Sequence, residues 1–260
     1  MFSGYPRLFL AAFGLAFTPV TSLASQNRYD ILAQVLRPYV SLFYSKSSTK
    51  AAQIQIVIRS FETRNGPIAS PLLNQPILID FEWPDKLRLE VTAPDQRTIV
   101  CRNAQQVWVY PRELGAELFA TASNAEKGAR VPDFRLPLHD QEILLLPALF
   151  RVVHLNNVTD SRGFPAWDLG FRTDPVLERE LEVPQIIVSV LVRQRDYSVE
   201  HLKIRSGLWS GEMDIYNVQF TARLPAETWV PDAQLSPNVV ALPPSLFRAA
   251  LRRVSNLNLW

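Results

Sequence analysis

The segment "RLEVTAPDQRTIVCRNAQQVWVY", residues 88–110, carries two alternating apolar runs separated by a proline-led corner. Leu87, Leu89 and Val91 form the run before the corner. Apolar residues between positions 99 and 110 form the run after it, around a short polar turn. Alternation with a period of two is typical of antiparallel strands that bury one face. The segment therefore predicts a β-meander with one buried face.

The same period predicts strands on both sides of this segment. Upstream, Ile54, Ile56 and Ile58 share one face of a predicted strand. In the strand that follows, one face carries Ile77, Ile79, Phe81 and Trp83, and the other carries Asp80 and Glu82. Downstream, we expect strands at residues 114–119, 166–171, 185–192, 197–204 and 212–221.

Three segments predict helices. Residues 30–43 place apolar side chains at helical spacing after a polar start at Asn27, and Pro38 is expected to kink or break this helix. The run "QEILLLPALFRVV", residues 141–153, is apolar on nearly every side, with Asp140 as a candidate N-cap, so it must be covered all round. Residues 245–254 predict a basic amphipathic helix. Docking on an anionic membrane surface or on a partner is the alternative for this helix, but we expect it to pack on the protein itself.

The N-terminus has the three parts of a secretion signal. Arg7 is the only charge in residues 1–24, an apolar stretch follows it, and Ser22-Leu23-Ala24 offers small residues for cleavage. The alternative is a membrane anchor, but the apolar stretch is short for a bilayer and Pro19 interrupts it. We therefore expect residues 1–24 to be a cleavable signal peptide and the protein to be exported.

Charge and cysteine content exclude several classes of protein. The expected cleavage leaves 26 basic and 25 acidic residues, a balance that argues against a nucleic-acid partner. Cys101 is the sole cysteine, so no intramolecular disulfide can form, and its place in an alternating run predicts a buried thiol.

No catalytic or metal-binding pattern is visible in the sequence. His139, His154 and His201 are far apart and belong to no spaced ligand motif. The segment around Ser210 lacks the nucleophile-elbow pattern, and there is no glycine loop that would hold a phosphate. We therefore expect a binding protein without a cofactor or metal, and not an enzyme.

Residues 81–113, "FEWPDKLRLEVTAPDQRTIVCRNAQQVWVYPRE", resemble the periplasmic outer-membrane lipoprotein carrier (LolA-like) family. The family pattern is a proline after the first strand, a strand of bulky apolar residues, a proline-acidic corner, and a strand with Trp, an aromatic position and Tyr. Here Pro84, Pro94-Asp95 and Trp108-Val109-Tyr110 fall at matching places. Residues 214–231 are similar to the family's late strand, with Trp229 in the aromatic place.

The resemblance implies a mainly β fold with covering helices. The expected architecture is an incomplete, curved antiparallel β-barrel with a helical lid over an apolar cavity. It would occupy residues 25–231, with residues 232–260 as a C-terminal extension packed on the barrel. Trp83 stands where the family commonly has a lid-controlling arginine, and Asn103-Ala104 replaces its Asp-Gly turn, so we expect a divergent member.

The resemblance also implies a site of apolar side chains. The residues expected to line the concave, lipid-binding face are Ile54, Ile56, Ile58, Ile79, Phe81, Trp83, Leu87, Leu89, Val91, Ile99 and Trp108. The residues expected in the lid are Leu32, Leu36, Leu145 and Leu149.

The expected function is that of a periplasmic carrier. Such a protein binds acyl chains of lipoproteins, or another lipid, and shuttles them towards the outer membrane. Its partners would be an inner-membrane release complex and an outer-membrane acceptor, and the carrier itself would be a monomer. Two alternatives stay open: a periplasmic sensor domain of the same fold that detects lipidated ligands, and a secreted hydrolase.

Overall fold

The computed structural model describes residues 27–94, 96–103, 106–128, 139–144, 146–180 and 184–255. The predicted signal peptide, residues 1–24, lies outside this part of the chain, as does Leu145. Within the described residues, no helix is long and apolar enough to cross a membrane.

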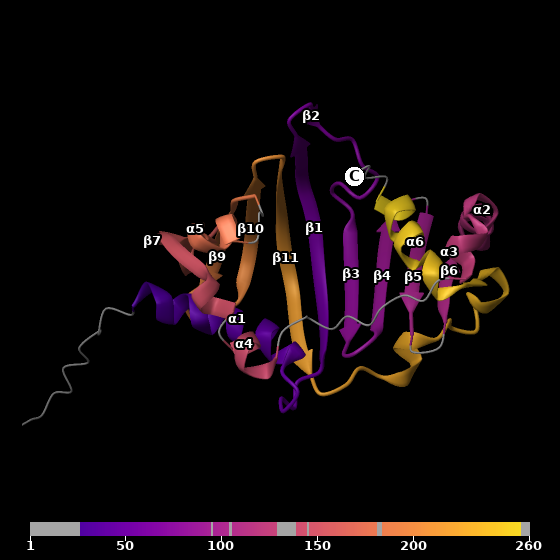
Figure 1. Cartoon of the computed structure of the whole chain (residues 1–260), viewed down its shortest axis with the longest axis horizontal. Helices are drawn as coiled ribbons and strands as arrows, with labels where there is room; N and C mark the ends of the chain where they lie inside the picture. Colours follow the sequence, from indigo (N-terminus) through magenta and orange to yellow (C-terminus); the bar gives the residue numbers. More distant parts are fainter. Residues whose placement is uncertain are drawn as a thin grey trace, which may run out of the picture.

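The described chain is built around one large antiparallel sheet (Figure 1). Its strands are β1 (Ala51–Thr63), β2 (Gly66–Pro67), β3 (Pro76–Glu82), β4 (Lys86–Ala93), β5 (Gln96–Arg102), β6 (Val107–Tyr110), β7 (Phe150–Thr159), β8 (Pro165–Thr173), β9 (Ile186–Arg193), β10 (Val199–Ser206), β11 (Trp209–Thr221) and β12 (Val240–Leu242). Their spatial order is β12-β6-β5-β4-β3-β1-β11-β10-β9-β8-β7, with β2 paired to β1. The sheet begins at β12 and ends at β7, so it is open.

Helices cover parts of this sheet. The α-helices are α1 (Arg28–Phe43), α2 (Arg112–Thr121), α3 (Asn124–Gly128), α4 (Asp140–Leu144), α5 (Pro175–Glu180) and α6 (Phe247–Ser255). The short 3-10 helices are η1 (Leu146–Leu149), η2 (Ala226–Trp229), η3 (Ser236–Asn238) and η4 (Pro244–Leu246). The predicted fold class, an open and mainly antiparallel β structure with helices on it, is confirmed.

The predicted meander is present as β3 to β6, and β8 to β11 correspond to the later predicted strands. The strand predicted at residues 114–119 is wrong, because this segment lies in helix α2. Leu114 and Leu118 are four residues apart, so a helix places both on one face. That face packs against the core beneath it.

The prediction for residues 141–153 is wrong in its second half. Only α4 and η1 are helical, and β7 begins at Phe150 as an outer strand of the sheet. Val152 is buried opposite Phe171 of β8, because a β-branched residue packs well on a pleated surface. Pro38 does not end α1, which continues to Phe43, and Asn27 accepts a hydrogen bond from the backbone N–H of Tyr29 as the N-cap.

One face of the sheet is apolar across its whole width, and we call it the apolar face. Residues that pair across antiparallel strands lie on the same face. Ile56 of β1 pairs with Ile77 of β3 and with Ile215 of β11. On the far side of β11, Met213 pairs with Leu202, Leu202 pairs with Val190, and Val190 pairs with Leu169. Ile77 also pairs with Val91 of β4, so the register joins the strands from β4 to β8 into one continuous apolar surface.

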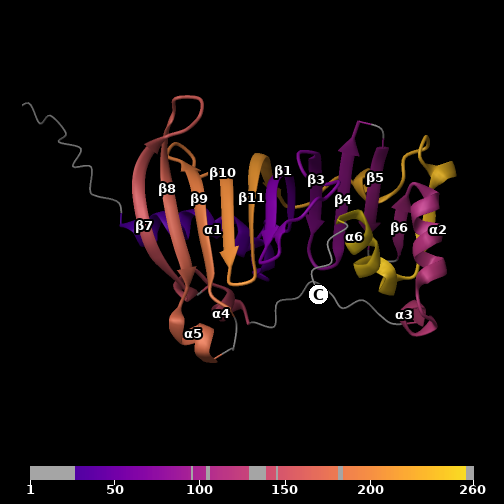
Figure 2. The same ribbon diagram turned by 90° about the horizontal axis from the view of Figure 1, so that it is seen from above.

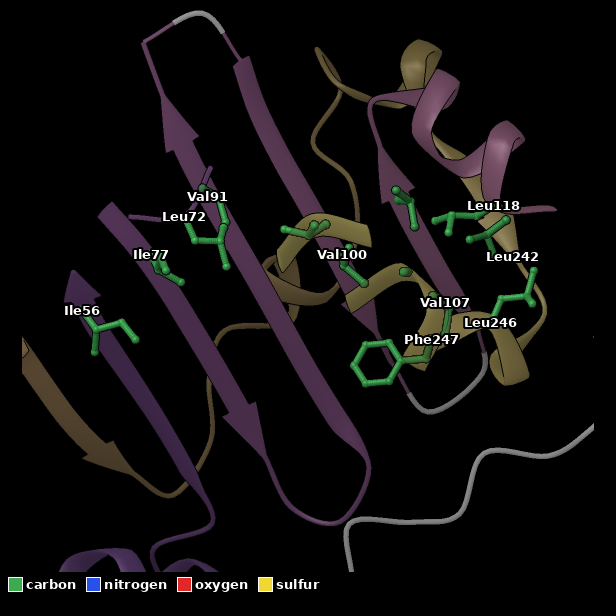
Figure 3. Packing of buried hydrophobic residues seen from close by; sticks show 13 residues of the cluster. Ile56, Leu72, Ile77, Val91, Val100, Val107, Leu118, Leu242, Leu246 and Phe247 are labelled. Carbon is green, nitrogen blue, oxygen red and sulfur yellow. The ribbon is translucent and has the colours of Figure 1, made fainter. Parts of the chain in front are cut away.

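Helices cover the two ends of the apolar face (Figure 2). Ile31, Leu32 and Val35 of α1 are buried against strands β7 to β10. At the other end, α2, η4 and α6 cover strands β4 to β6, with Leu246 and Phe247 almost fully buried (Figure 3). The apolar face thus carries two separate packed clusters.

The opposite face of the sheet carries a third, smaller cluster. Ile99, Cys101, Trp108 and Trp229 are buried together there. The indole N–H of Trp108 donates a hydrogen bond to the backbone carbonyl of Trp229, at 3.1 Å, and this bond fixes η2 against β6.

The C-terminal segment is part of the sheet and of its cover. Strand β12 pairs with β6 through Ala241 and Trp108. In α6, Phe247, Ala250 and Val254 are buried in the cluster below, and Arg253 forms a half-exposed ion pair with Glu117 of α2, at 2.6 Å. The apolar stripe of this helix therefore packs on the protein's own sheet.

Candidate functional site

A strip of half-buried apolar residues lies on the apolar face between the two covers. It crosses the neighbouring strands β11, β1, β3 and β4. Its members are packed against the first cluster but keep part of their surface open, and they are Ile54, Ile58, Ile79, Leu87, Leu89, Met213 and Ile215. We call this set the apolar strip. Aliphatic surface that the fold leaves partly uncovered is available to an apolar ligand.

The end of α1 borders the apolar strip on one side. Phe43, the last residue of α1, contacts Phe81 with ring centroids 5.7 Å apart. The ring of Phe43 also meets Trp83 edge-on at 5.5 Å. Because Phe81 pairs with Leu87 across β3 and β4, this aromatic group continues directly into the strip.

Helix α6 borders the strip on the other side, and a cavity of about 450 Å³ lies beside it. Leu72, Val91 and Val254 supply apolar walls, and Leu114 of α2 adds another. The Arg253–Glu117 ion pair lies at the same cavity. The cavity therefore combines an apolar interior with charged groups at its border.

The structure brings most of the predicted binding residues together. Ile54, Ile56, Ile58, Ile79, Leu87, Leu89 and Val91 are in or against one cluster on the apolar face. Phe81 shares this face by its register, and Trp83 lies next to it through Phe43.

Ile99 and Trp108 are not brought to this face. Leu89 pairs with Val100 and Val100 pairs with Val109, so the apolar face uses the even-numbered residues of β5 and the odd-numbered residues of β6. Ile99 and Trp108 therefore point to the opposite side, where they pack with Trp229. In this strand pair both faces are apolar, so the sequence alone did not show which set faces the site.

Met213 and Ile215 are site residues that the sequence analysis did not name. They alternate with charged and polar residues in "GEMDIYNVQF", which is the signal that marks the apolar side of β11. Their place at the β11 end of the strip follows from the pairing of β11 with β1, which joins distant parts of the chain.

The predicted lid residues lie at one end of the face. Leu32 is buried and Leu36 is packed in the second cluster, over strands β7 to β10. Leu149 is half-buried in η1, which contacts α1, and Leu145 lies outside the described residues. The described lid residues therefore cover the β7 half of the sheet and not the strip itself.

Polar chemistry is gathered on the opposite face. Asp80 is fully buried, and its carboxylate accepts hydrogen bonds from Gln53 at 2.8 Å and from Arg88 at 2.9 Å. Glu90 also bonds to Arg88 and to Arg97. These groups satisfy one another, so the cluster is a structural ion network.

A second polar cluster bears on the hydrolase alternative. Ser161, His201 and Asp214 line one pocket of about 400 Å³ on the polar face. His201 Nδ1 lies 2.7 Å from a carboxylate oxygen of Asp214, and its Nε2 lies 3.7 Å from a carboxylate oxygen of Glu212. Burial pushes the pKa of Asp214 up, yet hydrogen bonds from His201 and Arg59 outweigh it and leave the pKa below its usual range. Among the described hydrogen bonds, none joins Ser161 to His201, so the pocket lacks the contact that activates a serine.

The only cysteine is buried and its thiol is held neutral. Cys101 is fully buried on β5, and burial raises the pKa of its thiol to about 12. A thiol held neutral is a poor nucleophile and a poor metal ligand. In the described residues, no group of three or more His, Cys, Asp or Glu side chains is placed to hold a metal ion.

No family model and no curated protein matches the chain. Among solved structures, it is similar to a chain of the Pseudomonas aeruginosa MucA/MucB complex. The identity is 10%, over 78% of this chain and 62% of that chain, and the TM-score is 0.39. It is also similar to a LolA superfamily protein from Nitrosomonas europaea, with 10% identity, 76% and 96% coverage, and a TM-score of 0.27. A third is the lipoprotein LppX of Mycobacterium tuberculosis, with 12% identity, 75% and 97% coverage, and a TM-score of 0.35. One of these structures is thus a member of the LolA superfamily, the family that residues 81–113 resemble.

Proposed function

We propose that the apolar strip binds the acyl chains of a lipid or a lipoprotein. One observation carries this proposal. In the described part of the chain, the helices that cover this continuous aliphatic face reach only its two ends, and the seven side chains of the strip between them are half-buried. Each methylene group that moves from water onto such a surface gains roughly 0.8 kcal/mol.

We further propose that the protein acts as an exported carrier in the periplasm and delivers its acylated cargo towards the outer membrane. A carrier needs a surface that binds and also releases. A strip that stays partly open to solvent suits this requirement better than a closed cavity, because a bound chain keeps a path out. The inner-membrane donor and the outer-membrane acceptor belong to the same proposal.

The test uses two substitutions on one strand. Ile79 of β3 lies in the strip, and its neighbour Leu78 is also half-buried but faces the other side of the sheet. The Ile79→Gln variant should bind a fluorescent fatty-acid probe about tenfold more weakly, because the loss of one apolar contact costs ~1–2 kcal/mol. The matched Leu78→Gln variant should bind within about twofold of the original chain.

The outcomes separate binding from stability. Both variants should melt at similar temperatures, since both side chains are half-buried. If the unaltered chain fails to bind the probe, or if both variants bind it equally, then the apolar face is an ordinary core and acyl binding is wrong.

A further inference from the structure

The two edges of the sheet are protected very differently. The outer edge of β7 pairs with no strand in the described part of the chain, and β7 is ten residues long without proline or lysine. Strand β12, at the other edge, has three residues and is followed by Pro243 and Pro244. Short strands, prolines and lysines are the usual means of preventing edge-to-edge pairing. The β7 edge has none of these, although a bulge between Val152 and His154 interrupts its start.

The hydrogen bonds at the β7–β8 turn show which backbone groups face outwards. The N–H of Asp160 donates to the carbonyl of Phe164 at 2.9 Å, so this pair is hydrogen-bonded across the turn. Antiparallel pairs alternate between bonded and non-bonded, and the next pair is therefore Thr159 with Pro165, which are not bonded to each other. The carbonyl of Pro165 instead accepts from the N–H of Gln194, at 3.2 Å. By the same alternation, Leu155, Asn157 and Thr159 direct their N–H and C=O groups away from β8.

The side chains along the β7 edge would not repel one another if two copies of this edge paired. The regular part of β7 after the bulge, residues 154–159, contains no Lys, Arg, Asp or Glu. Arg151, before the bulge, is neutralised by Asp174 at 2.6 Å. Like charges directly opposite one another destabilise strand pairs, and self-pairing here creates none.

We propose that the β7 edge binds the β7 edge of a second copy of this chain. Centred on Asn157, an antiparallel arrangement pairs Leu155 with Thr159 of the partner subunit and Asn157 with Asn157 of the partner subunit. Every outward-facing residue then exchanges N–H···O=C bonds. The two-fold axis is perpendicular to the sheet, so both apolar faces lie on the same side of the joined sheet. This dimer replaces the monomer that we expect from the sequence, and it does not depend on the proposed acyl binding.

The contact is small, and this sets how the dimer behaves. Stable interfaces bury more than about 1,000 Å², and six residues of one strand edge supply only part of that area. The dimer is therefore a weak one whose population rises with protein concentration by mass action. Equilibrium sedimentation of the mature chain, over about a hundredfold range of concentration, measures its dissociation constant.

Two substitutions at Asn157 test the arrangement. Asn157→Pro removes the central outward N–H. It removes no bond to β8, because this N–H points away from β8, and proline is tolerated at such edge positions. Asn157→Lys keeps the N–H but places two positive charges together at the two-fold axis. Each should raise the dissociation constant at least about tenfold. Asn157→Ala loses the same side-chain contact with Gln194 but retains the N–H, and should stay within about twofold of the unaltered chain.

A variant at the other edge completes the test. Ala241→Lys, an exposed position in β12, should leave the dimer unchanged. Circular dichroism checks that each variant is folded. If Asn157→Pro is unfolded, Asn157→Lys alone tests the dimer arrangement. The proposal is overturned if the unaltered chain is a monomer at every concentration. It is also overturned if Ala241→Lys, and not Asn157→Lys, dissociates the dimer.

Discussion

The attachment of α6 to the sheet can be tested by replacing Phe247 with alanine. The Phe247 side chain is 2% exposed and lies in the same cluster as Leu246, Val100 and Val107 (Figure 3). Truncation of a buried phenylalanine to alanine costs ~3–5 kcal/mol, because transfer free energy is lost and a cavity remains. The Arg253–Glu117 ion pair, which links α6 to α2, is half-exposed and contributes at most ~1 kcal/mol. Apolar packing should therefore account for most of the attachment.

Thermal unfolding followed by circular dichroism measures this cost. For a chain of this size, 1 kcal/mol corresponds to ~2–4 °C, so Phe247→Ala should lower Tm by ~6–20 °C. Arg248→Ala is the control, since Arg248 is exposed on the same helix and should change Tm by little. Binding to anionic vesicles should be the same for both variants. A Phe247→Ala protein with an unchanged Tm but weakened vesicle binding would mean that α6 docks on a membrane.

Three further predictions concern buried and charged groups. Asp80→Ala should lower the free energy of unfolding in urea by ~3–5 kcal/mol, because it leaves Arg88 without one of its two carboxylates; a loss under 1 kcal/mol would mean that water reaches the site. Cys101 should not react with thiol reagents in the folded state at pH 8. Since burial raises its pKa to about 12, stability should fall as pH rises above the unfolded value of about 8.5; rapid labelling of the native protein would contradict this. The pKa of Asp196 is lowered to about 2. Burial alone would raise this pKa, but hydrogen bonds from Ser198 and the positive charge of Arg193 outweigh the effect of burial. The stabilisation by the Asp196 carboxylate is present above the unfolded pKa of about 3.9 and is lost as pH falls towards 2. Asp196→Ala should therefore make the free energy of unfolding fall less steeply between these pH values. The change should be slight, because the carboxylate is 39% exposed.

The meander and the phase of its apolar residues were predictable because one face of β3 and β4 carries charges. Asp80 and Glu90 mark the polar side, so Ile79 and Leu89 had to face the core. The same reasoning was insufficient for β5 and β6, where Ile99 and Val100 are both fully buried. There, the segment around Trp229 covers the second face, and no local pattern indicates that cover.

Helix and strand assignments failed where a short apolar run fits both periods. Residues 114–119 and 150–153 are such runs, and tertiary contacts decided each of them. The strip itself depends on Met213 and Ile215 lying beside Ile58 and Ile56. This neighbourhood follows from strand order, which the sequence pattern does not specify.

The pairing of β1 with β11 also determines how the chain can fold. Strands β3 to β6 form one series of hairpins between consecutive strands, and β7 to β11 form another, so each half can assemble from contacts that are near in sequence. The seam between the halves is different, since Thr63 pairs with Trp209 and Ala51 pairs with Thr221. Closing so long a loop is entropically costly, and pairings of this kind slow folding. The joining of β1 to β11 should therefore be the late, rate-limiting event. Because that event completes the apolar strip, the strip forms only when the last long strand, β11, has paired with β1.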